Sequence, residues 1–152
     1  MNKTEALIDQ LKTTYNRRSW HGPSLMEILK DVDHVHAQRR PLYGRHTIWE
    51  IVDHMTAWNT VPIMTLLSGV YPEMPPEKDW PPMGDTEEEW QESIQKLGES
   101  VNVLTTAISK MSDKKYDEII NGKDYNYNSM LYGVLTHNLY HMGQLSILKK
   151  KE

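Results

Sequence analysis

The sequence predicts an all-α protein, a four-helix bundle in which residues 1–152 form one domain. Four segments place apolar residues three and four positions apart, which is the spacing of an amphipathic helix. Three helical segments also begin with a capping box, in which Ser or Thr is followed three residues later by Glu. No stretch alternates convincingly between polar and apolar residues, so the sequence contains no clear signal for a half-buried strand.

The first part of the chain contains a long helix and a shorter helical segment. The long helix is expected over residues 3–17 because four of its apolar residues share one face: Leu7, Ile8, Leu11 and Tyr15. Ser24 and Glu27 then form a capping box at the start of the shorter segment. Pro41 is expected to end this segment, because proline cannot donate a backbone hydrogen bond inside a helix.

The second long helix is expected to run from a capping box of Thr47 and Glu50 to about Leu67. Pro62 lies within this helix and predicts a kink. Residues 69–85 are rich in proline and predict a long, stiff loop. A loop of this length can cross a bundle from end to end. It is therefore compatible both with an up-down-down-up order of helices and with simple alternation.

The third long helix follows a capping box of Thr86 and Glu89 and contains the most regular pattern in the chain. Its apolar residues recur in alternating steps of four and three, as in a heptad repeat: Trp90, Ile94, Leu97, Val101, Leu104, Ile108 and Met111. This seam is expected to face the interior rather than a partner subunit. Ser129 is expected to cap the last long helix, which extends to about Lys149.

Composition and charge argue against several kinds of partner. Lys and Arg number 17 against 21 Asp and Glu, whereas a nucleic-acid-binding protein normally has a basic excess. No apolar run approaches the roughly 20 residues that cross a bilayer, and the N-terminus lacks the pattern of a secretory signal. We therefore expect a cytoplasmic protein without a nucleic-acid or membrane partner. Cysteine is absent, which excludes disulfides, thiolate metal sites and a thiol nucleophile of the protein's own.

Three of the seven histidines are candidates for a metal site. His137 and His141 lie four residues apart on the last helix, so their rings project from one face and can bind one ion. His54 lies midway along the second long helix, at the margin of its apolar stripe. Burying three neutral imidazoles without partners is unfavourable, and a divalent cation would accept a lone pair from each. The alternative is that they are ordinary hydrogen-bonded core histidines.

Residues near these histidines supply three candidate catalytic groups. The zinc-protease pattern His-Glu-x-x-His is not met, because Asn138 stands where the glutamate would be. Glu50, one turn before His54, is a candidate base, although its place in a capping box is the stronger explanation. Tyr140 and Gln144 adjoin the histidines and can orient water or substrate; simple packing explains them equally well.

Several motifs resemble those of the DinB/YfiT-like superfamily, small four-helix bundles related to bacillithiol- and mycothiol-dependent transferases. The most specific is the run HNLYHMGQ at residues 137–144. The runs WHGPS at residues 20–24 and HTIWEIVDH at residues 46–54 point to the same group. The resemblance extends over nearly the whole chain, from about residue 4 to residue 149.

The resemblance implies a divalent metal ion held by three histidines, with water in the remaining coordination positions. The ligands correspond to His54, His137 and His141, so this chain retains the complete triad. Zinc and nickel are the favoured ions, and cobalt and ferrous iron also suit three imidazoles. The resemblance further implies an up-down-down-up topology and a homodimer.

Three neutral ligands leave the ion its whole charge and an open coordination position, which is typical of a catalytic site. Such an ion can bind a thiol as its thiolate or acidify a bound water. Because the chain has no cysteine, the leading hypothesis is a metal-dependent S-transferase that joins a low-molecular-weight thiol to an electrophilic substrate. The alternatives are a metal-dependent hydrolase and a non-catalytic metal-binding dimeric bundle.

Overall fold

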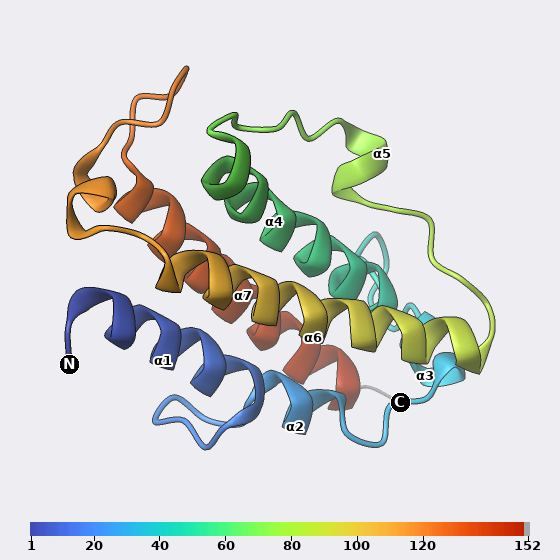
Figure 1. The fold of residues 1–152 in the computed structure, drawn as a ribbon. Coiled ribbons are helices and arrows are strands. Elements are labelled where there is room, and N and C mark those ends of the chain that lie inside the picture. The colour runs from blue at the N-terminus through green and yellow to red at the C-terminus, as the bar shows by residue number, and fades with distance from the viewer. Residues whose placement is uncertain (151–152) are drawn as a thin grey trace.

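The computed structural model describes residues 1–150, in which helices are joined by loops and turns and no strand is present. Four long helices lie side by side (Figure 1): α1 (Lys3–Asn16), α4 (Ile48–Ser68), α6 (Glu87–Ser109) and α7 (Tyr127–Lys150). Short helices connect them: α2 (Leu25–Leu29), α3 (His34–Gln38), α5 (Pro76–Asp79) and the 3-10 helix η1 (Asp113–Asp117). The all-α prediction is confirmed. None of the described helices combines the length and apolar character needed to cross a membrane.

The predicted capping boxes form and determine where three of the helices begin. Ser24, Thr47 and Thr86 each accept a hydrogen bond from the backbone N–H of the glutamate three residues further on. In each box the glutamate carboxylate accepts in return from the backbone N–H of the cap residue. Asn2 and Glu5 form a fourth box at the start of α1. Each box satisfies donors that the first turn of a helix would otherwise leave unpaired.

The predicted cap at Ser129 is wrong. Helix α7 already begins at Tyr127, two residues earlier. The side-chain oxygen of Asn126 accepts from the Ser129 backbone N–H at 2.9 Å and from its hydroxyl at 3.0 Å. Asparagine is as good a cap as serine, and here Asn126, the residue before Tyr127, caps the helix.

Two connecting segments differ from the expectation. The segment predicted to end at Pro41 is divided, because Asp31 adopts a left-handed backbone conformation with φ of 63° and separates α2 from α3. The side chain of Asp33 then caps α3. Residues 69–85, expected to be a loop, contain the helical turn α5. This turn begins at Pro76, whose fixed φ suits the first position of a helix.

The core lies between the long helices. Helix α4 packs against α6 and α7, and α1 packs against α6. The heptad seam of α6 faces this interior, as predicted, and its buried members are Trp90, Leu97, Val101, Leu104 and Ile108. Trp49 and Trp90 pack against each other, with ring centroids 5.3 Å apart. Their indole N–H groups donate to the Ser93 hydroxyl and to the Val32 carbonyl, so these two large side chains are buried without unpaired donors.

The segment between α4 and α6 completes the site that the helices form. It returns along α4 to the beginning of α6, and its turn α5 packs against α4 (Figure 1). This path brings residues 79 and 80, at the end of α5, against the histidine of α4.

Candidate metal centre

Three histidines from two helices meet between α4 and α7. His54 comes from the middle of α4, and His137 and His141 come from successive turns of α7. The Nε2 atom of His137 lies 3.1 Å from Nε2 of His54 and 3.1 Å from Nε2 of His141. The three ligand atoms all lie within 4.8 Å of one another. The structure therefore brings together the three residues that the sequence singled out, in an arrangement that can hold a metal ion.

Asp79, the last residue of α5, orients the ring of His54. The Nδ1 atom of His54 lies 2.8 Å from the Asp79 carbonyl oxygen and 3.1 Å from its carboxylate Oδ1. Both oxygens are acceptors, so Nδ1 donates its proton and the neutral ring has its lone pair at Nε2. The indole N–H of Trp58 donates to the same carboxylate at 2.6 Å and holds it in place. An acceptor behind the ring is the usual arrangement for a metal-binding histidine.

Gln144 has the corresponding role for His141. Its Oε1 atom lies 2.7 Å from His141 Nδ1, and its Nε2 atom donates to the Tyr140 hydroxyl at 3.2 Å. With the amide in this orientation, His141 donates from Nδ1 and presents a bare lone pair at Nε2. Of the two candidate residues on this helix, Gln144 thus contacts a histidine directly. Tyr140 contacts Gln144, and its side chain is largely exposed.

The third ring, that of His137, differs from the other two. Its Nδ1 atom is buried and has no hydrogen-bond partner among residues 1–150. Burial, and then the neighbouring rings of His141 and His54, lower the pKa of His137 to about 4. Burial likewise lowers the pKa values of His54 and His141. All three rings are therefore neutral near pH 7, which is the form that binds a metal.

Trp80 covers the side of the site that faces the return segment. Its indole stacks on the ring of His54, with centroids 3.9 Å apart and planes 9° from parallel. It also stacks on His46, which precedes α4, with centroids 3.4 Å apart. The indole of Trp80 thereby shields this face of the His54 ring from water.

The carboxylate of Glu50, the candidate base, is engaged by other partners. It accepts from the Thr47 backbone N–H at 2.7 Å and lies 2.8 Å from Arg40 and 3.4 Å from His46. Burial raises the pKa of Glu50, but the hydrogen bonds from Arg40 and Thr47 outweigh it and lower the pKa overall. A carboxylate held in this way stabilises the beginning of α4 and is a weak base.

The donor set fits a divalent cation. Two nitrogens bound at about 2.0–2.1 Å to a tetrahedral zinc ion are about 3.3 Å apart. Two of the three separations here are close to this value, at 3.1 Å each, and all three lie within 4.8 Å. His54 and His141 both present bare acceptors toward His137. A proton on Nε2 of His137 would satisfy only one of them well, whereas a cation accepts a lone pair from all three rings.

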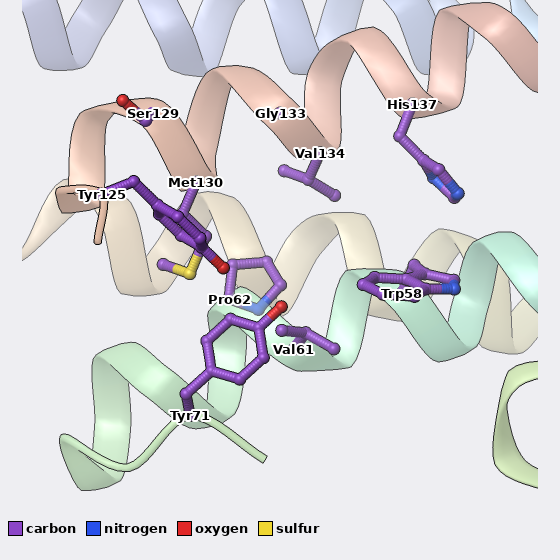
Figure 2. A pocket seen from close by; sticks show the side chains of 10 residues that line it. All are labelled: Trp58, Val61, Pro62, Tyr71, Tyr125, Ser129, Met130, Gly133, Val134 and His137. Atoms are coloured by element: carbon purple, nitrogen blue, oxygen red, sulfur yellow. The ribbon is translucent and has the colours of Figure 1, made fainter. Parts of the chain in front are cut away.

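Two cavities adjoin the triad. One, of about 420 Å³, lies between α4 and α7 and reaches His137 (Figure 2). The other, of about 520 Å³, reaches His141 and includes the polar side chains of Arg45, His46 and Gln144 among its lining residues. The first cavity is lined mainly by apolar side chains, whereas the second has cationic and amide groups. His137 and His141 therefore border two chemically different cavities, whereas His54 lines neither of them.

Together, the fold and the site define a helical protein with a three-histidine centre that can hold a metal ion. The family model of the DinB superfamily matches residues 19–145, and the chain therefore belongs to the DinB superfamily. This match confirms the resemblance that the motifs at residues 20–24, 46–54 and 137–144 suggested. No curated protein and no solved structure matches the chain.

Sequence reasoning missed Asp79 and Trp80, both of which contact His54. Metal-binding histidines generally have an acceptor behind the ring, which predicts that some such residue exists. It does not predict which, because Asp79 lies 25 positions from His54 and only the path of the return segment brings them together. Trp58, one turn after His54 on α4, is half-buried and lines the apolar cavity.

Proposed function

We propose that the protein is a metal-dependent S-transferase that joins a low-molecular-weight thiol to an electrophilic small molecule. The observation that carries this proposal is the convergence of three neutral imidazoles, with one cavity bordering His137 and another bordering His141. His54, His137 and His141 would hold the ion through their Nε2 atoms, and zinc or nickel suits this donor set best. The two cavities differ in polarity, so they offer separate places for two reactants of different polarity beside the triad.

The chain's own residues prepare the site in three ways. Asp79 and Gln144 hold two of the rings in the tautomer that directs Nε2 inward. Trp80 shields His54 from water. The cavities on either side hold the reactants next to each other, so that proximity contributes to the rate. When bound, a divalent cation supplies the Lewis acidity that favours the thiolate form of the cosubstrate at neutral pH.

The reaction is a substitution in which a carbon–sulfur bond forms and the bond between carbon and a leaving group breaks. The leaving group departs with its electron pair, and the proton of the thiol passes to solvent. The sulfur comes from outside because the chain has no cysteine. In this scheme Gln144 is a positioning residue, Tyr140 supports Gln144, and Glu50 stabilises the start of α4.

The second candidate function is hydrolysis, in which water attacks the substrate in place of a thiol. The openness of both cavities to small molecules favours it, since water has access wherever a thiol does. The two candidates differ in one requirement: a transferase turns over electrophiles only with added thiol, whereas a hydrolase does not need one. A non-catalytic bundle would turn over no substrate, and removal of its metal would cost much of its stability.

Elemental analysis of the purified protein tests the metal site before any substrate is known. Wild-type protein should contain about one divalent ion per chain, and His54→Ala should contain almost none, because two imidazoles bind far more weakly than three. His21→Ala is the matched control, since His21 is exposed and lies outside the triad. Metal-free wild-type protein, or full metal content in His54→Ala, would contradict the proposal.

A conjugation assay with metal-loaded protein, a thiol and an alkyl or aryl halide then tests the reaction. Conjugate should form with wild-type protein, depend strictly on the thiol, and disappear in His137→Ala while circular dichroism remains helical. Turnover without thiol would identify a hydrolase instead. If the wild type were inactive and the His137→Ala variant unfolded, the metal would be structural and catalysis would be abandoned.

We further propose that the chain is a single domain, that its long helices follow an up-down-down-up order and that it forms a homodimer. The directions of α1, α4, α6 and α7 in Figure 1 support this helix order. The dimer follows from the family resemblance and would be tested by light scattering after gel filtration, in which a monomer mass would contradict it.

A further inference from the structure

The apolar cavity beside His137 extends well beyond the triad. It lies between α4, which contributes Trp58, Val61 and Pro62, and α7, which contributes Met130 and Val134 (Figure 2). Its volume of about 420 Å³ is within the range of small-molecule sites. Most of its lining side chains carry no group that could bind an ion, so this cavity favours an apolar ligand over a charged one.

The end of this cavity away from the triad contains two tyrosine hydroxyl groups. Tyr71, which follows α4, and Tyr125, which precedes α7, face each other there, with ring centroids 6.4 Å apart. Their hydroxyl oxygens lie toward each other near Pro62, whereas Trp58 and His137 form the opposite end (Figure 2). Lys123 lies over the ring of Tyr71, with Nζ 3.9 Å from the centroid, and this cation–π contact helps to hold that ring in place.

Burial and hydrogen bonding to Tyr71 raise the pKa of Tyr125 to about 12, so its hydroxyl remains protonated and able to donate. The nearby hydroxyl of Ser129, by contrast, already donates to Asn126. The cavity therefore has an apolar body with hydrogen-bonding hydroxyl groups at the end away from the histidines.

We propose that this cavity binds the electrophilic substrate, and that the substrate is an uncharged compound with one aromatic ring or short alkyl chain and an oxygen acceptor at its far end. That the bound compound is an electrophilic substrate rests on the proposed function. The binding of such a compound in this cavity does not depend on turnover. The reacting carbon would lie at the end formed by Trp58 and His137, and the acceptor would receive a hydrogen bond from Tyr71 or Tyr125.

An NMR titration of the full-length protein with 4-acetylbenzyl alcohol tests this binding without any reaction, because the probe has no leaving group. The methyl signals of Val61, Met130 and Val134 should shift, since these residues line the cavity. The measurement is made both with and without added zinc. Binding to metal-free protein separates the cavity from the proposed catalysis.

Two matched glycine substitutions on α7 locate the site. A Cβ atom built on Gly133, which lines the cavity, or on Gly143, which does not, meets no atom within 4 Å beyond its chain neighbours and the nearby backbone of α7. Both positions therefore have room for the first atom of a side chain, and leucine favours the helix more than glycine does. Gly133→Leu should weaken binding of the probe at least tenfold by filling the cavity, whereas Gly143→Leu should bind it as wild type does. Equal binding by the two variants would overturn the proposal, as would the absence of binding to wild type.

A second pair of probes tests the tyrosine end. 4-Isopropylbenzyl alcohol has nearly the shape of the acetyl compound and keeps its benzylic hydroxyl, but it lacks the ketone oxygen. Wild type should bind the acetyl probe more tightly by about five- to tenfold, the effect of one neutral hydrogen bond of about 1 kcal/mol. In the double variant Tyr71→Phe/Tyr125→Phe this preference should vanish. A preference that persists there would refute the role of the hydroxyls. Elemental analysis could find no metal while the probes still bind in this pattern. That result would refute the proposed catalysis but not the assignment of the cavity.

Discussion

At the scale of single residues, the three histidines are not equivalent. His54 and His141 each donate from Nδ1 to a defined acceptor, on Asp79 and Gln144 respectively. The Nδ1 atom of His137 is buried without a partner among residues 1–150. Because an acceptor behind the ring fixes the tautomer and raises the basicity of the ligand nitrogen, His54 and His141 are the better prepared ligands. His137 is the one that borders the apolar cavity.

The contribution of Asp79 can be measured by its removal. Asp79→Ala should weaken zinc binding about 10-fold, the lower end of the usual effect of such partners, because the backbone carbonyl of residue 79 still accepts from His54. Competition with a chromophoric chelator measures the affinity. Asp113→Ala, at an exposed aspartate of η1, is the control for the loss of one negative charge. Identical affinities of the two variants would show that the carboxylate has no role in the site.

At the scale of secondary-structure elements, a buried polar chain joins α4, α6 and α7 beside the site. The side-chain amide of Asn138 donates to the Asn59 side chain at 3.0 Å, and Asn59 donates to the Ser100 hydroxyl at 2.9 Å. Ser100 in turn donates to the Leu97 carbonyl at 2.7 Å. Buried hydrogen bonds of this kind fix how helices are set against one another, because a shifted helix would leave the donors unpaired. Asn138 is next to His137 in the sequence. These hydrogen bonds therefore also fix the position of His137 relative to His54 on α4.

Asn59→Ala should lower the free energy of unfolding by at least about 2 kcal/mol, because it leaves the buried amide of Asn138 without an acceptor and creates a cavity. Urea unfolding followed by circular dichroism measures this change. The exposed Asn102 of α6 offers a matched control, and Asn102→Ala should stay within about 0.5 kcal/mol of wild type. A similar loss in both variants would mean that the polar chain does not join the helices.

At the scale of the whole molecule, the metal site links α4 to α7 through side chains that are far apart in the sequence. Any ion bound to the folded protein and not to the unfolded chain stabilises the fold by mass action. The same three rings, neutral and buried, make the metal-free fold sensitive to acid. Both properties belong to the molecule as a whole, because they depend on the difference between its folded and unfolded states.

Added zinc should therefore raise the free energy of unfolding of the wild type by about 2.7 kcal/mol at a free concentration 100 times Kd. Thermal unfolding at increasing zinc concentration measures the shift. His137→Ala should show little shift at the same concentrations, because only two ligands remain. An equal shift in the variant would place the bound zinc elsewhere on the protein.

The metal-free protein should lose stability as the pH falls from about 7 toward 4. In the unfolded chain a histidine binds a proton near pH 6.5, whereas in the fold burial lowers the pKa of His137 to about 4. Between these values the unfolded state binds more protons, so the free energy of unfolding decreases with falling pH. His54 and His141 act in the same direction. Urea unfolding at several pH values measures the slope, and His137→Ala should show a shallower one; parallel slopes would contradict the assignment.

Local sequence patterns were sufficient where the structure depends on neighbours along the chain. The Thr47–Glu50 box marks the start of α4, since a cap and its partner lie within one turn. The heptad spacing of α6 predicts which of its side chains are buried, because helix periodicity sets them on one face. The four-residue spacing of His137 and His141 likewise predicts that they adjoin each other. The start of α7 was misplaced, because Asn126 and Ser129 are both competent caps and sequence does not rank them.

By itself, then, the sequence determined the four long helices, the face of α6 that is buried and the three histidines that can hold a metal ion. Tertiary structure alone decided that His54 meets the pair on α7, that Asp79 and Trp80 lie against it, and that an apolar cavity ends at two tyrosines. The reason is physical. Helix periodicity and capping act over a few residues, whereas these contacts join segments whose separation is set by how the long helices pack and by the path of the chain between them.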